Sequence, residues 1–140
     1  MTYRILIMAD HFSRDLYPLS VLKVYLDREL PDSIVLVASF DIWETVLHGF
    51  RPHLLIIQHL HGHRNQSMAR WQHNQGGLVV TIPTEGRPNT IGQLEWATTS
   101  WPPELCDLYL SWNKEVQKNL PSSVNSAVIG FPRLPFYRYP

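Results

Sequence analysis

The chain has 140 residues, enough for one domain that buries a hydrophobic core without disulfides. Its twelve basic and twelve acidic residues give a formal net charge of zero, which argues against binding nucleic acid through bulk charge. The single cysteine, Cys106, excludes an intramolecular disulfide and a cysteine zinc site. No apolar run approaches the length of a membrane span and no signal peptide is evident, so we expect a cytoplasmic protein.

Short apolar runs alternate with segments of helical spacing along the whole chain. The predicted strands are residues 3–8, 34–38, 54–57, 78–82, 105–110 and 127–130. The predicted helices are residues 16–30, 41–49, 65–75, 91–97 and 113–120. Continuous apolar strands are typical of parallel sheets that are buried on both faces. The pattern therefore predicts a single α/β domain over residues 1–140, a three-layer sandwich with a mainly parallel sheet of about six strands.

Four residues indicate where the first two helices begin or end. Pro18 is compatible with the first turn of the first helix. Asp41 is expected to cap the second helix, with Glu44 three residues later, and Gly49 is expected to end it.

Two proline-rich stretches stand out from this regular alternation. Residues 83–103 form a long connection, and connections of this length are often functional. Residues 131–140 are apolar for a chain end, and two interpretations stay open: a tail folded over the domain, or the start of a linker to a second domain.

In open parallel sheets, ligands bind beyond the carboxyl ends of the strands. Glu85 follows the fourth predicted strand, where a shielded carboxylate could take a proton from an attacking hydroxyl, although a solvated loop glutamate fits the spacing as well. Arg133 follows the last strand, and its guanidinium could bind a carboxylate or phosphate or make a surface ion pair. His11 follows the first strand without a GxGxxG sequence, which disfavours a dinucleotide-binding dehydrogenase but leaves His11 as a base or a phosphate or hydroxyl ligand.

Histidines and tryptophans supply the remaining candidates. His59, His61 and His63 alternate in the loop after the third strand, and His73 follows further on. Zinc binds imidazole nitrogen well, but no acidic or cysteine ligand stands at motif spacing, so we expect a polar or substrate-binding loop and no metal. The tryptophans either stack on a sugar face or belong to the core: Trp71, Trp96, Trp101 and Trp112.

The carboxyl-terminal third resembles a known family. Residues 107–112 read DLYLSW, a predicted helix follows, and residues 127–133 read AVIGFPR. This pattern resembles the end of the amino-terminal Rossmann-like domain of GT-B glycosyltransferases of bacterial surface polysaccharide synthesis. Thr84-Glu85-Gly86 is similar to that family's acidic turn, with Thr84 in place of its first acidic residue and Asn113 in place of a usual glycine.

The resemblance implies a function for the chain as half of an enzyme. GT-B enzymes hold the acceptor mainly on an amino-terminal domain and the nucleotide sugar on a second Rossmann-like domain. By this resemblance Glu85 is the general base, and His11, His59 and Arg133 border the cleft that binds a carbohydrate acceptor. The nucleotide sugar would bind in a second domain or a partner chain, so we expect no cofactor and little activity in this domain alone, and peripheral association with the inner membrane stays open.

Two other functions remain open from the sequence. One is a non-catalytic flavodoxin-like or receiver-like binding or regulatory domain, for which Asp10 and Asp41 are available, although no second acid adjoins Asp10 and no lysine follows the fifth strand. The other is a small metallohydrolase that uses the histidine cluster. The donor sugar and the oligomeric state are left undetermined.

Overall fold

A computed structural model describes residues 2–84 and 90–130 of the chain. Within them, six strands form one sheet in the order β2-β1-β3-β4-β5-β6, and every neighbouring pair is parallel. The strands are β1 (Tyr3–Ala9), β2 (Ser33–Ser39), β3 (Leu54–Ile57), β4 (Leu78–Thr81), β5 (Leu108–Ser111) and β6 (Ser126–Val128). The predicted α/β fold with a parallel, Rossmann-like sheet is confirmed.

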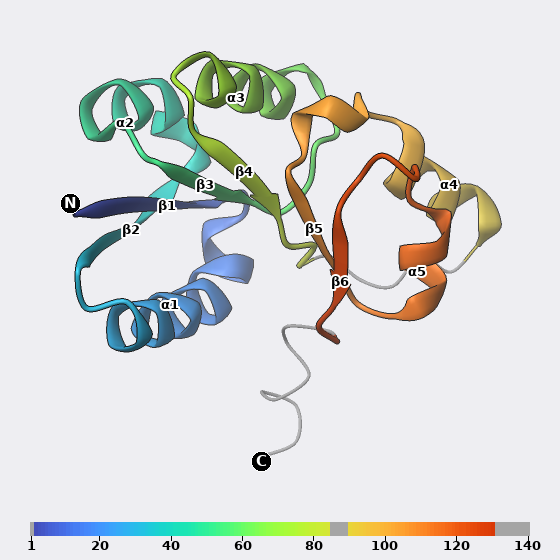
Figure 1. Cartoon of the computed structure of the whole chain (residues 1–140), viewed down its shortest axis with the longest axis horizontal. Helices are drawn as coiled ribbons and strands as arrows, with labels where there is room; N and C mark the ends of the chain where they lie inside the picture. Colours follow the sequence, from blue (N-terminus) through green and yellow to red (C-terminus); the bar gives the residue numbers. More distant parts are fainter. Residues whose placement is uncertain (1, 85–89, 131–140) are drawn as a thin grey trace.

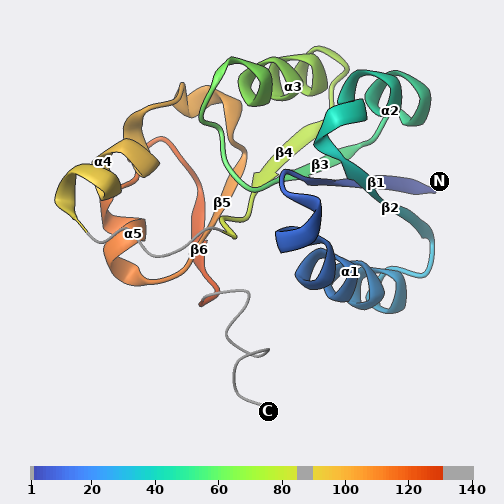
Figure 2. The same cartoon turned by 180° about the vertical axis from the view of Figure 1, so that it is seen from behind.

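The helices lie on both faces of the sheet. They are α1 (Phe12–Glu29), α2 (Trp43–Phe50), α3 (His63–Asn74), α4 (Ile91–Thr99) and α5 (Lys114–Asn119), with short 3₁₀ turns η1 (Phe40–Ile42) and η2 (Pro103–Leu105). Figures 1 and 2 show α1 on one face and α2 and α3 on the other. Right-handed crossovers explain this division, because the chain moves outward from β1 to β2 and then returns across β1 to β3.

The core consists of two apolar clusters, one on each face of the sheet. In β1, Leu6 and Met8 belong to the cluster under α2 and α3, whereas Ile5 and Ile7 pack in the other cluster with Leu19 of α1. Successive strand residues point to opposite faces, so a strand buried on both sides must be apolar at every position. This explains why the strands appear as continuous apolar runs in the sequence.

The first helix begins earlier than the sequence predicted. It starts at Phe12, so Pro18 lies inside it, in the second turn rather than the first. The earlier start follows from Asp15, whose carboxylate Oδ2 accepts the backbone N–H of His11 at 2.9 Å. The backbone N–H groups of Arg14 and Asp15 both donate to the carbonyl of His11.

The capping predictions for the second helix are wrong. Asp41 lies in η1, where its backbone N–H donates to the hydroxyl of Ser39, and α2 begins without a side-chain cap. Gly49 lies inside α2, and Arg51 ends it in a left-handed conformation with φ of 48°. The fifth strand also starts later than predicted, because Pro103 to Leu105 form the turn η2.

Candidate functional site

The carboxyl ends of β1 and β3 meet at the point where the strand order of the sheet reverses. Open α/β sheets bind their ligands at such a switch point. Gln58, buried directly after β3, joins the two ends: its amide nitrogen donates to the carbonyl of Met8, and its amide oxygen accepts the backbone N–H of Asp10 at 3.3 Å. Asp10 and His59, which follow these strands, are thereby brought side by side.

His59 is held in one orientation by a partner at each ring nitrogen. Its Nε2 lies 3.2 Å from Oδ2 of Asp10, and its Nδ1 lies 2.8 Å from Nδ2 of Asn65. The same Asn65 nitrogen donates to the carbonyl of His59 at 2.9 Å, which fixes the amide with its nitrogen toward the ring. Because an amide nitrogen only donates, Nδ1 accepts and the ring proton sits on Nε2, facing Asp10. The side chains of Asp10 and His59 are 21% and 25% exposed, so a ligand can reach them.

Asp15 anchors the amino-terminal end of α1 next to this pair. Its fully buried carboxylate accepts two hydrogen bonds from Arg14, both at 2.9 Å, and one from the hydroxyl of Thr84 at 3.0 Å. Burial by itself would raise the pKa of Asp15, but the hydrogen bonds from Arg14, the His11 backbone and Thr84, together with the Arg14 charge, outweigh it and lower the pKa. Arg14 also reaches Asp10, with Nη2 at 3.4 Å from Oδ2.

A stack of aromatic rings extends from His59 toward α4. The rings of His59 and His61 lie 5.3 Å apart between centroids, and the rings of His61 and Trp96 lie 3.8 Å apart, each pair with an interplanar angle of 20°. Nδ1 of His61 is 2.7 Å from the hydroxyl of Ser100, one turn beyond Trp96 in the chain. The loop after β3 is therefore tied to the connection between β4 and β5.

The remaining histidines of the predicted cluster lie elsewhere. His63 is exposed at the start of α3, where Ser67 donates to its carbonyl. His73 lies at the other end of α3, with Nε2 2.8 Å from Asp107, whose carboxylate also accepts the backbone N–H of Val79 at the amino end of β4. In residues 2–84 and 90–130, no three side chains of the histidine, cysteine, aspartate or glutamate type are placed to hold a metal ion.

Of the predicted site residues, His11 and His59 fall within the described part of the chain. His11 is exposed and directly precedes α1, and His59 follows β3, so both lie at the carboxyl edge of neighbouring strands. Glu85 and Arg133 lie outside the described residues, and their places in the site stay predictions.

Sequence reasoning missed the residues that organise the site. Asn65 and Gln58 were not singled out, and Asp10 was not paired with His59. The sequence does place polar residues directly after the first and third strands. They predict a shared site only when those two strands are known to be neighbours in the sheet. Nothing local marks Asn65, which contacts His59 from the first turn of α3.

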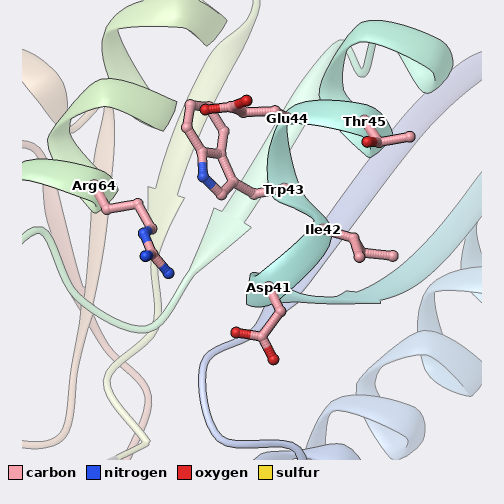
Figure 3. Close-up of a pocket in the computed structure, with 6 residues that line it drawn as sticks. All are labelled: Asp41, Ile42, Trp43, Glu44, Thr45 and Arg64. Atoms are coloured by element: carbon pink, nitrogen blue, oxygen red, sulfur yellow. The ribbon is translucent and has the colours of Figure 1, made fainter.

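A polar pocket lies on the same edge, between α3 and the segment formed by η1 and the start of α2. It has a volume of about 390 Å³, and Figure 3 shows Arg64 and Asp41 extending toward the gap from opposite sides, with Glu44 and Trp43 beside it. The guanidinium of Arg64 also lies over the ring of Phe40, at 5.3 Å from its centroid. Its wall carries two carboxylates, those of Asp41 and Glu44, and one guanidinium, that of Arg64.

Comparisons with known proteins assign no family to the chain. No family model matches the chain, and no curated protein is similar to it at a significant level. Among the described residues, no helix is both long enough and apolar enough to cross a membrane.

Proposed function

We propose that the chain is the acceptor-side domain of a GT-B-like glycosyltransferase, which transfers a sugar from a nucleotide sugar to a hydroxyl in surface polysaccharide synthesis. The observation that carries this proposal is the Asp10–His59 pair, oriented by Asn65 at the switch point of the sheet. An ionised carboxylate only accepts hydrogen bonds, so Asp10 can accept one from a sugar hydroxyl. Exposed His11 lies directly beside Asp10 and would border the same cleft.

A buried carboxylate at the amino terminus of α1 supports the acceptor role. Nucleotide-binding Rossmann units place a diphosphate on the amino terminus of the helix after the first strand. Here the carboxylate of Asp15 lies at that position and accepts the backbone N–H of His11. The nucleotide sugar would therefore bind to a second Rossmann-like domain or a partner chain, and this chain would bind the carbohydrate acceptor.

The proposed reaction needs one proton acceptor and one oriented hydroxyl. The acceptor oxygen bonds to the anomeric carbon, the bond from that carbon to the phosphate oxygen breaks, and the electron pair leaves with the nucleoside diphosphate. The hydroxyl proton passes to a carboxylate, which the family resemblance assigns to Glu85. Asp10, held by the Nε2–H of His59, would orient the hydroxyl by accepting a hydrogen bond from it.

One observation favours a second function, a non-catalytic binding module. The order β2-β1-β3-β4-β5 is that of flavodoxin-like domains, which bind flavin mononucleotide at the β1/β3 switch point. A flavin phosphate would meet the carboxylate of Asp10 there, and like charges disfavour such a complex.

The two functions are separated by titrating the chain with methyl glycosides, with flavin mononucleotide and with beryllofluoride, followed by NMR. We expect glycosides to shift the signals of Asp10, His59 and Asn65, and the Asp10→Asn variant to bind them more weakly. Binding of flavin or beryllofluoride without any glycoside response would replace the proposal with the second function. Transfer is then measured with the full-length gene product, radiolabelled nucleotide sugars and membranes of the source organism, as label entering polysaccharide.

A further inference from the structure

Trp96 differs from the other tryptophans of this chain in its exposure. All five lie among the described residues; Trp101 is buried, and three others are half-buried: Trp43, Trp71 and Trp112. Trp96, on α4, is 57% exposed. An exposed indole offers a large apolar face on which a ligand can pack.

The exposed indole is held in place from one side. His61 stacks against it at 3.8 Å, the hydroxyl of Ser100 lies 2.7 Å from His61, and His59 stacks behind His61. His59 is itself fixed by Asp10 and Asn65, so the stack extends from the switch point outward to Trp96. A ring supported in this way binds a ligand at a low cost in conformational entropy, because its orientation is already set.

We propose that the outer face of Trp96 is a stacking platform for one pyranose ring of an oligosaccharide acceptor. A pyranose presents an apolar face of C–H groups, which packs on indole, and hydroxyls at its rim. The rings of His61 and His59 lie between Trp96 and Asp10, at successive centroid separations of 3.8 Å and 5.3 Å, so a saccharide on the outer face of Trp96 would need more than one unit, running along the edge of the stack, to reach Asp10. That the bound saccharide is the acceptor rests on the proposed function, whereas sugar binding at Trp96 does not.

The polar groups along the stack favour a sugar over a nucleotide. The hydroxyl of Ser100 and the ring of His61 suit neutral hydroxyl groups, and the carboxylate of Asp10 repels a phosphate. A nucleobase or a flavin would also stack on indole, so the experiment includes both as competing ligands.

The test measures the affinity of the chain for glucose oligosaccharides of one to four units, with adenosine and flavin mononucleotide alongside. We expect the longer saccharides to bind best and to shift the indole N–H signal of Trp96 in NMR spectra. The Trp96→Ala variant should bind about tenfold more weakly, the change expected for loss of one aromatic stacking contact, and Trp96→Phe should keep most of the affinity. Ile91→Ala, at another exposed position of α4, is the matched control and should bind as the wild type does.

Four outcomes test the platform and the glycosyltransferase proposal separately. Unchanged affinity in a folded Trp96→Ala protein, with the NMR spectrum verifying the fold, would overturn the platform, as would a response to adenosine or flavin alone. Saccharide binding at Trp96 in a protein that transfers no sugar would keep the platform and remove the enzyme. Transfer that is unaffected by Trp96→Ala would keep the enzyme and remove the platform.

Discussion

Replacing Asp15 with asparagine tests whether its ion pair with Arg14 holds the amino terminus of α1 beside the site. The Asp15 carboxylate is fully buried and accepts hydrogen bonds from three residues: Arg14, His11 and Thr84. Removing one partner of a buried ion pair costs about 3–5 kcal/mol, because the other charge is left uncompensated. Here the Arg14 side chain is 28% exposed, so water would relieve part of that penalty. We therefore expect a loss of about 2–3 kcal/mol in the free energy of unfolding.

The assay is urea unfolding at neutral pH, with Asp27→Asn as the control. Asp27 pairs with Lys23 on the exposed surface of α1, and such pairs contribute about 0–1 kcal/mol. The urea midpoint of Asp15→Asn should fall clearly and that of Asp27→Asn should barely change. If the two variants unfold within about 0.5 kcal/mol of each other, the ion pair of Asp15 does not carry this part of the fold.

The same variant has a distinct pH dependence. The pKa of Asp15 is lower in the folded state than in the unfolded state, so the unfolded chain binds the proton more readily. The stability from this group is fully present above its unfolded pKa of about 3.9 and is lost as the pH falls through the folded pKa. Acid unfolding of Asp15→Asn should therefore lack this contribution and show a shallower decline of stability below about pH 4.

Two further substitutions test the packing and the catalytic assignment. Gly77→Ala should destabilise the fold by about 1–3 kcal/mol in urea unfolding, because the added Cβ would lie 1.8 Å from Nε2 of buried Gln72 and 3.1 Å from the carbonyl of Pro52. Its control, Gly49→Ala, has open space in α2 and should be neutral or stabilising by up to about 1 kcal/mol; equal effects would contradict the packing argument. Glu85→Gln, tested together with the proposed donor-binding domain or partner chain, should lower turnover roughly 10²- to 10⁴-fold, and wild-type turnover in that variant would remove Glu85 as the proposed base.

Element types followed from the local pattern, whereas element ends did not. Runs such as residues 54–57 contain no polar residue. An apolar residue at every position is typical of a strand that is buried on both faces of its sheet. The predicted start of α1 is too late. Pro18 indicates a first turn near residue 18, whereas the hydrogen bond from the His11 backbone N–H to Asp15 stabilises a helix that begins at Phe12. The end of α2 was placed at Gly49 because glycine favours the left-handed conformation, which Arg51 adopts instead.

The sequence by itself determined the α/β class, the parallel sheet and the edge at which polar side chains collect, because burial on both faces and strand–helix alternation leave few arrangements. Tertiary structure decided which of those side chains meet. Asp10 and His59 are 49 positions apart, and Asp15 and Thr84 are 69 apart. Their contacts depend on β3 pairing with β1 and β4 with β3, and on the hydrogen-bond register between them. Pairing order is a property of the whole sheet, and no local run of residues encodes it.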